Sequence, residues 1–165
     1  MYAVRQWSVR HARGLNAFYR AFESVLVALH PLFKRLGYER LERPVATVER
    51  TVKGLLFDCL MCGQCILSST GMSCPMNCPK NLRNGPCGGV RADGACEVFP
   101  DRPCVWVEAW EGSKRLPLWR DHMHHLNPPV DWRLNGTSSW INLVTGRDRR
   151  APAGWAARAA DADPA

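Results

Sequence analysis

The sequence predicts a small protein of mixed, mostly α-helical and otherwise irregular structure, in which a cysteine-rich loop domain follows amphipathic helices at the amino terminus. Three observations support this fold class. Two stretches before residue 58 repeat apolar residues at the spacing of one helix face. All eight cysteines lie between Cys59 and Cys104, and Gly and Pro interrupt that segment without a sustained helical or strand period. At 165 residues, one compact domain is the expected size.

The first amphipathic stretch predicts a helix from about Ser8 to His30. Pro31 cannot donate the hydrogen bond of a continuing helix, but it suits the first turn of a new one. A kink and a short second helix to Leu36, closed by Gly37, are therefore expected. The apolar face of these helices is formed by Leu15, Phe18, Phe22, Leu26, Leu29 and Phe33.

A further helix is expected from Pro44 to the first cysteine, Cys59. Its apolar residues recur at helical spacing and would form one packed face: Val45, Val48, Val52, Leu55 and Leu56. The chain thus divides into amphipathic helices that dock to a partner (residues 1–57), a cysteine-rich domain (58–148) and a disordered tail (149–165). The tail is rich in Ala, Pro and Asp.

The segment after the last cysteine carries shorter signals. Val105 to Ser113 is expected to form a short helix, with Trp106 and Trp110 one turn apart. Residues 114–135 are expected to be irregular because prolines interrupt them. Hydroxyl residues at 137–139 precede an apolar run, as they do at a helix start, so a last helix to Thr145 is expected.

The cysteine spacing indicates metal ligation. No export signal is evident, so a cytoplasmic, reducing location is expected, where clustered cysteines bind metals instead of forming disulfides. Two-residue gaps in the opening triplet let three sulfurs converge on one four-iron cluster, as in the run that opens bacterial ferredoxin motifs. Isolated pairs with such a gap are more typical of zinc. The expected ligands are Cys59, Cys62, Cys65, Cys74, Cys78, Cys87, Cys96 and Cys104.

The number of cysteines does not decide between the metals, because eight thiolates satisfy two four-iron clusters and equally two zinc ions. The triplet favours two four-iron clusters, with zinc as the alternative. The spacing leaves open which cysteines share a cluster. Lys80 and Arg83 lie between ligands, where they either offset cluster charge or lie on a solvated loop. Bound metal clusters are expected to organise the loop domain, which cannot bury enough apolar surface to order itself.

The charge distribution restricts the expected partners. Residues 1–53 carry +6 of the formal net charge of +7, so only the amino-terminal third offers a basic surface. This third alone suggests a basic zinc-ribbon module that binds nucleic acid, and nucleic acid is not an expected partner of the whole chain. No apolar stretch approaches the ~20 residues of a membrane-spanning helix, so no membrane partner is expected. No catalytic triad or nucleotide-binding fingerprint is present.

Around the cysteines, several strings occur at fixed offsets over roughly residues 45–148. They are Cys59-x2-Cys62-Gly63-x-Cys65, Cys74-Pro75-x2-Cys78-Pro79-Lys80-x2-Arg83-Asn84-Gly85-Pro86-Cys87-Gly88-Gly89, Cys96-Glu97-Val98, Arg102-Pro103-Cys104-Val105-Trp106, Gly136-Thr137-Ser138-Ser139-Trp140 and Gly146-Arg147-Asp148. Together they resemble the cysteine-rich methylenetetrahydrofolate reductase carboxy-terminal family. In that family the domain is fused to a flavin-containing reductase barrel or forms a separate small subunit beside it, and some members are described as carrying four-iron clusters or zinc.

The chain is too short to contain the barrel, so it resembles the separate small subunit. The resemblance implies that catalysis takes place elsewhere and that no residue of this chain is catalytic. It implies that the eight cysteines pass electrons, through two four-iron clusters, to the flavin of a large reductase subunit that reduces methylenetetrahydrofolate. A further redox protein would then donate the electrons. The alternative is a zinc-stabilised structural or assembly subunit of the same enzyme.

Overall fold

The computed structural model of the chain describes residues 2–85, 87–116 and 120–150. Within these ranges the protein is mostly helical and has no β-strand, only two isolated bridges, Val90 to Cys96 and Ala95 to Pro103. The expected small, mostly helical fold is therefore confirmed. In chain order the helices and 3-10 turns are α1 (Tyr2–Arg10), α2 (Ala12–Ala28), α3 (His30–Leu36), α4 (Tyr38–Phe57), η1 (Pro75–Asn77), α5 (Val105–Ser113), η2 (Arg120–His124), η3 (Trp132–Leu134) and α6 (Ser139–Thr145).

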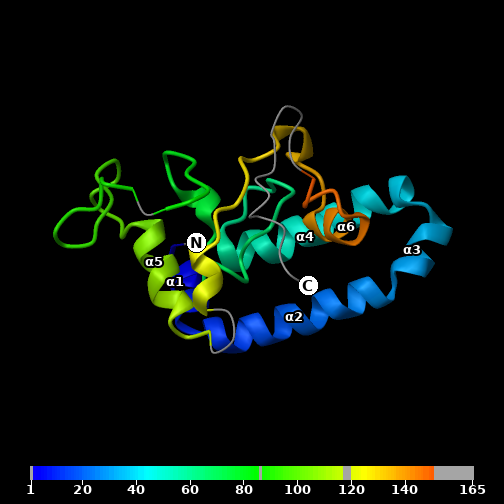
Figure 1. Cartoon of the computed structure of the whole chain (residues 1–165), viewed down its shortest axis with the longest axis horizontal. Helices are drawn as coiled ribbons and strands as arrows, with labels where there is room; N and C mark the ends of the chain where they lie inside the picture. The colour runs from blue at the N-terminus through cyan, green and yellow to red at the C-terminus, as the bar shows by residue number, and fades with distance from the viewer. Residues whose placement is uncertain (1, 86, 117–119, 151–165) are drawn as a thin grey trace.

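Two long helices, α2 and α4, frame the molecule and run in opposite directions, with α3 turning the chain between them (Figure 1). Gly37, at φ 86°, makes the sharp turn into α4. α6 packs against both α2 and α4, and α1 packs against α4 and α5. The loops around residues 80–104 project at the end of the molecule that carries α5. The frame therefore holds the cysteine-rich loops along one side.

The first expected helix, Ser8 to His30, is in fact divided between two helices. The chain turns at His11, which separates α1 from α2 and has no side-chain capping bond. The expected break near Pro31 is confirmed, since α3 begins at His30 with the proline in its first turn. α3 ends at Leu36, as the sequence indicated.

α4 begins at Tyr38, six residues before the expected start at Pro44. Pro44 lies inside the helix, at the loss of one backbone hydrogen bond. The early turns are tied to the rest of the protein by Glu42, whose carboxylate accepts a hydrogen bond from the Ser138 backbone N–H at 2.5 Å. Tertiary contact therefore overrides the local signal of the proline.

α4 buries a charged pair together with Ala46 and Phe57 and exposes part of its expected apolar face. The buried face includes Glu49 and Lys53, whose partners on α6 fix the rotation of the helix. Three of the five expected residues form an exposed stripe along the outer side of α4, whereas Val45 and Leu56 are half-buried. The stripe is Val48, Val52 and Leu55, which are 56%, 43% and 60% exposed.

α2 is likewise rotated away from its expected face. Leu26 is buried and Leu15 and Phe22 are half-buried, but Phe18 is 71% exposed. Tyr19 is buried instead, because it reaches the cysteine pocket described below. The apolar spacing thus predicted the helix correctly and its inner face only in part.

The carboxy-terminal half confirms more of the expectations. The described residues between Cys59 and Cys104 contain only η1 and the two isolated bridges. α5 spans the expected residues, and α6 ends at Thr145 as expected. The hydroxyl of Ser138 caps α6 by accepting from the Ile141 N–H at 3.3 Å. The hydroxyl residues ahead of the apolar run therefore predicted the start of this helix correctly.

Between α5 and α6, residues 114–116 and 120–138 are irregular apart from η2 and η3. Residues 117–119 and most of the expected tail, 151–165, lie outside the described residues. None of the helices in the described ranges combines the length and the apolar character that crossing a bilayer requires.

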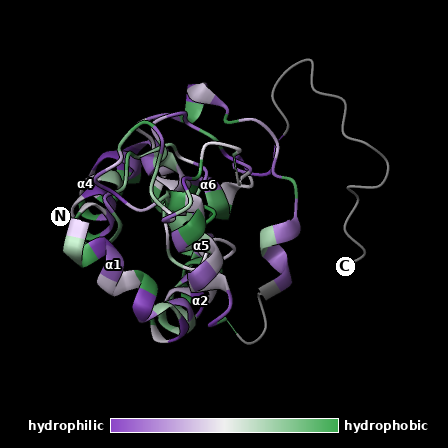
Figure 2. Cartoon of the chain, turned by 90° about the vertical axis from the view of Figure 1, so that its left-hand side faces the viewer, coloured by the Kyte–Doolittle hydropathy of each residue, from purple (hydrophilic) through white to green (hydrophobic). Residues whose placement is uncertain are grey.

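Two clusters of buried side chains form the core, and each contains cysteines. Figure 2 shows the hydrophobic residues concentrated in the middle of that view. The larger cluster is Ala12, Tyr19, Phe57, Cys62, Leu67, Met72, Cys74, Met76 and Leu116. The smaller cluster, beside α5, is Cys78, Cys104, Val105, Trp106 and Ala109.

α5 and the loop before Cys74 meet through two glycines in close backbone contact. A Cβ on Gly112 would lie 2.2 Å from the Gly71 carbonyl oxygen. A Cβ on Gly71, which has φ 57°, would lie 2.2 Å from the Gly112 carbonyl carbon. By contrast, a Cβ on Gly14 of α2 would meet nothing within 4 Å. Gly112 and Gly14 are both helical glycines, so substitution of Gly14 is a matched control for substitution of Gly112.

We expect Gly112→Ala to lower the free energy of unfolding by about 1–3 kcal/mol, because the added methyl group overpacks the contact. Gly14→Ala, the control, should raise it by about 0.5–1 kcal/mol, because alanine is the better helix former. Urea denaturation of both variants measures these changes. Equal effects of the two substitutions would contradict the close contact of α5 with the loop.

Candidate metal centre

The structure sorts the eight cysteines into two sets of four, and each set lines one pocket. The pocket bordered by α4 and α6 is lined by the first cysteine set: Cys59, Cys62, Cys65 and Cys74. The pocket beside α5 is lined by the second cysteine set: Cys78, Cys87, Cys96 and Cys104. All eight are free thiols. The sequence left the grouping open, and in the structure Cys74 is the fourth cysteine that lines the pocket of the triplet.

The triplet loop owes its shape to residues in the left-handed backbone region. Asp58 ends α4 at φ 53°, and Met61 follows at φ 52°. The Met61 N–H donates to Cys59 Sγ at 3.4 Å. Gly63, at φ 76°, passes so close to Leu134 that a Cβ would lie 2.3 Å from its carbonyl oxygen. The loop therefore folds tightly enough to direct its cysteines toward one pocket.

The thiols of the first set perturb one another. A hydrogen bond between the side chains of Cys74 and Cys59 lowers the pKa of Cys59 to about 7 and raises that of Cys74 well above its ordinary value. Burial raises the pKa of the Cys62 thiol, which donates to the Gln64 carbonyl oxygen at 3.6 Å. Because the thiolate is the form that binds metals, Cys59 is the most readily available ligand of these three.

A buried ion pair on α4 borders the first pocket. Lys53 and Glu49 are each 1% exposed, and the ammonium and carboxylate are 2.8 Å apart. The same ammonium donates to the Ser139 hydroxyl at 2.7 Å, and the Ser138 hydroxyl donates to Glu49 at 2.6 Å. The pair is thus satisfied by hydroxyl groups at the start of α6, which attaches that helix to α4.

Lys53 also faces the thiols. The Tyr19 hydroxyl is a hydrogen-bond partner of both Lys53 and Cys65. Burial alone would lower the pKa of Lys53, but interactions with Cys65, Tyr19 and Glu49 raise it well above its ordinary value. The ammonium also lies 5.2 Å from the ring centres of Tyr19 and Trp140. Lys53 is therefore a permanent positive charge at the edge of the pocket.

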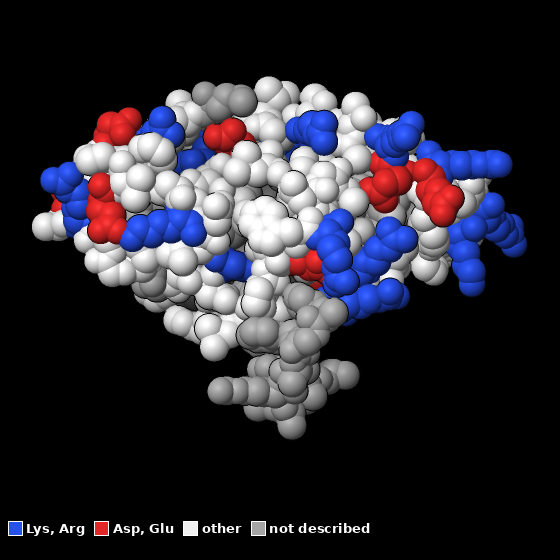
Figure 3. Space-filling view, turned by 90° about the horizontal axis from the view of Figure 1, so that it is seen from above, with Lys and Arg blue, Asp and Glu red and all other residues white. Residues whose placement is uncertain are grey.

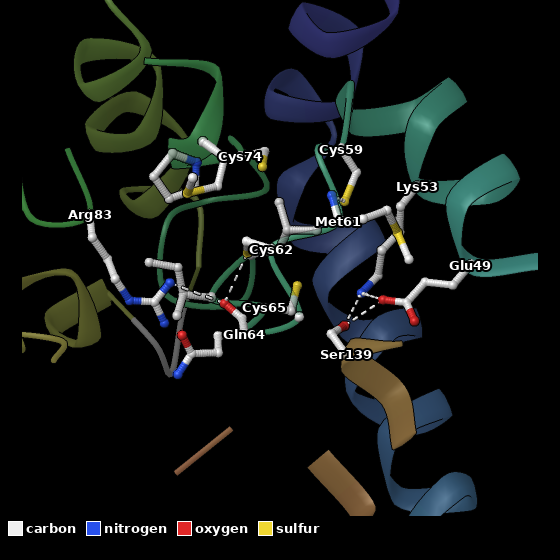
Figure 4. Close-up of a pocket in the computed structure, with 15 residues that line it drawn as sticks. Glu49, Lys53, Cys59, Met61, Cys62, Gln64, Cys65, Cys74, Arg83 and Ser139 are labelled. Atoms are coloured by element: carbon white, nitrogen blue, oxygen red, sulfur yellow. Dashed lines mark hydrogen bonds and ion pairs between the residues drawn. The ribbon is translucent and has the colours of Figure 1, made fainter. Parts of the chain in front are cut away.

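Arg83 supplies a second buried cation to the same pocket. The residue is 8% exposed, donates to the Gln64 carbonyl oxygen at 3.1 Å and interacts with the Cys62 thiol. Burial lowers its pKa, and the neighbouring thiols act in the opposite direction. Its Nε is buried without a hydrogen-bond partner. In Figure 4, Arg83 and Lys53 lie on opposite sides of the cysteines.

The second cysteine set is held by turns. Cys78 directly follows η1, and Cys104 directly precedes α5; both are buried. Cys87 and Cys96 are half-buried on the projecting loops. The backbone N–H groups of Cys96 and Cys104 each donate at 2.9 Å to a carbonyl oxygen of the same loop region. The second set is therefore fixed by short-range backbone contacts.

The cations that line the second pocket all have carboxylate partners. Two of them are open to solvent, since the side chains of Lys80 and Arg102 are 39% and 53% exposed. Of the two cations that the sequence placed between ligands, Lys80 therefore lies on the solvated surface, whereas Arg83 is buried beside the thiols. The pairs are Arg5 with Glu108, Lys80 with Glu97, and Arg102 with Asp101.

Sequence reasoning missed the polar residues that α2, α4 and α6 bring to the first pocket. Glu49 and Lys53, four residues apart on a helix, have the spacing of an ordinary surface pair. Nothing in the sequence signals that Tyr19 or Ser139 comes near the cysteines. Among the described residues, no three Cys, His, Asp or Glu side chains lie close enough together to hold a single metal ion. Metal ligation by the two sets is therefore taken up below as a proposal.

The described part of the chain is a small helical protein whose loop cysteines gather in two sets of four, the arrangement of a candidate two-centre metal–thiolate protein. The chain belongs to the family described as methylene-tetrahydrofolate reductase C terminal, whose sequence model matches residues 38–133. The match covers more than half of the chain and all eight cysteines, and it confirms the resemblance carried by the cysteine strings. Searches of curated proteins and of solved structures find no match.

The two pockets predict which cysteines act together. Cys74→Ala removes a thiol from the first set and Cys96→Ala removes one from the second, so each variant should retain about half of the metal bound by the wild type. Cys62→Ala should behave as Cys74→Ala does. Metal analysis of protein purified without oxygen measures this. Full metal content in either Cys74→Ala or Cys96→Ala, or complete loss from both, would contradict the grouping.

Proposed function

We propose that the chain is the iron–sulfur electron-transfer subunit of a methylenetetrahydrofolate reductase and passes electrons to the flavin of a partner subunit. The observation that carries this proposal is the grouping of all eight thiols into two sets of four, the first of which contains the ferredoxin-like triplet. The family match supports the choice of enzyme. Catalysis on the folate takes place in the partner.

The chemistry of the first pocket fits a four-iron cluster. Four thiols are the ligand set of such a cluster, and Cys59 ionises near neutral pH. Four thiolates on a four-iron cluster leave a net negative charge, and Lys53 and Arg83 place two buried positive charges beside it. When bound, the cluster supplies one-electron oxidation and reduction. The same four thiols also suit zinc, so the preference for iron rests on the triplet spacing.

The two sets are directly connected through η1. Cys74, of the first set, precedes this turn, and Cys78, of the second, follows it. Four residues of chain span at most about 14 Å, so the Cα atoms of these two cysteines cannot lie further apart than that. The turn is fixed by the Asn77 amide, which donates to the Phe57 carbonyl oxygen at 2.9 Å. Electrons would therefore have a short covalent path between the two centres.

The exposed apolar stripe on α4 supports docking of the partner at this helix. Its residues face outward, whereas Lys53 on the same helix faces the first pocket. A subunit bound to the stripe would lie about one helix diameter, about 10 Å, from the first cysteine set.

Figure 3 shows Lys and Arg gathered at the end of the molecule that carries α3. The exposed basic residues of α3 and the start of α4 are Lys34, Arg35, Arg40 and Arg43.

Charges placed in the stripe should prevent docking. We expect the double substitution of Val52→Lys and Leu55→Lys to weaken affinity for the flavin-containing reductase subunit at least about tenfold, because unpaired charges in an apolar contact are costly. Val27→Lys, at an exposed valine of α2, is the control and should bind normally. Calorimetry measures the affinities, and stopped-flow bleaching of the partner's flavin measures electron delivery. Flavin reduction that is equally fast without this chain would show that the proposed function is wrong.

A further inference from the structure

The two cysteine pockets differ in how their cations are neutralised. Around the second set, each cation has a carboxylate within 4.0 Å. Around the first set, Lys53 has Glu49, but in the described part of the chain Arg83 forms no ion pair within that distance. Asp148 feels the charge of Arg83, but it forms no ion pair with the guanidinium within that distance. The first pocket therefore holds one buried cation, Arg83, that no carboxylate pairs directly.

A buried cation without a counter-charge is unfavourable, because water no longer solvates it. Besides the Gln64 carbonyl oxygen and Asp148, Arg83 interacts with thiols of the first set, Cys62 first among them, followed by Cys65 and Cys74. Its unpartnered Nε is a further donor that the protein itself leaves unsatisfied. Anionic sulfur in this pocket would compensate the guanidinium. Arg83 is thus placed to hold a negatively charged centre.

We propose that Arg83, assisted by Lys53, makes the centre at the first cysteine set the one with the higher reduction potential, so that an electron shared between the two centres resides mainly at the first. This inference rests on the proposed iron–sulfur function. Reduction adds one electron, and hence one negative charge, to a centre. A nearby fixed cation stabilises the reduced form more than the oxidised form.

Burial acts in the opposite direction, because a low dielectric disfavours the more highly charged form. The same low dielectric, however, strengthens the attraction between the centre and the two buried cations. At the second set the cations are already neutralised by carboxylates, and two of them are screened by solvent. The difference between the pockets therefore favours the first set as the electron acceptor.

Redox titration with dithionite as reductant, followed by electron paramagnetic resonance, tests this assignment. Cys96→Ala, which keeps only the first set intact, should show a higher potential than Cys74→Ala, which keeps only the second. In the otherwise intact protein, Arg83→Leu should make reduction at the first set at least about tenfold less favourable, a fall of about 59 mV for one electron. Arg83→Lys retains the positive charge, so its first-set potential should stay close to that of the wild type. Arg102→Leu, which removes a cation near the second set, is the control and should leave the first potential unchanged.

The outcomes separate the two proposals. An unshifted potential in Arg83→Leu with full iron content would overturn the role of Arg83, while the proposed electron-transfer function would stand. If Arg83→Leu loses the iron of the first set, its potential cannot be measured, and the two cysteine variants provide the test. A higher potential in Cys74→Ala than in Cys96→Ala would then overturn the inference. Wild-type protein that contains no iron would overturn both.

Discussion

The segment between Cys59 and Cys104 has to be ordered with little help from secondary structure. Its described residues form one 3-10 turn and two isolated bridges, although fixing each residue costs about 1–2 kcal/mol of backbone entropy. Both core clusters include cysteines from this segment. In the proposed iron–sulfur protein, the groups bound by these thiols would contribute to folding as well as to function.

The helices are adapted to this segment. α4 directs Glu49 and Lys53 inward and its valine stripe outward, because the interior beside the first cysteine set requires charge and hydrogen bonds. α6 completes the arrangement by supplying Ser138 and Ser139 to the ion pair. α4 therefore places its buried ion pair beside the first pocket on one side and its exposed apolar stripe on the other side, where the proposed partner would dock.

Local sequence patterns predicted where the helices lie better than they predicted which helix faces are buried. α5 and the cap of α6 follow from short-range signals, which the structure confirms. The inner face of α4 could not be predicted, because apolar spacing carries no information about a polar pocket assembled from distant segments. The sequence placed Lys80 and Arg83 between the cysteines, but only the structure shows that Arg83 is buried and Lys80 is exposed. The cysteine spacing identified the ligand candidates but not the two sets. The boundary between the sets falls between Cys74 and Cys78, where the chain changes direction through η1.

Metal and sulfide content, measured together with the visible spectrum on protein prepared without oxygen, tests the central claim most directly. An electron-carrying subunit should contain about eight iron and eight sulfide per chain, with a broad absorption band near about 400 nm that bleaches on reduction. About two zinc and no sulfide would contradict the account. The two cysteine sets would then be structural centres, and the chain would order its partner without supplying electrons.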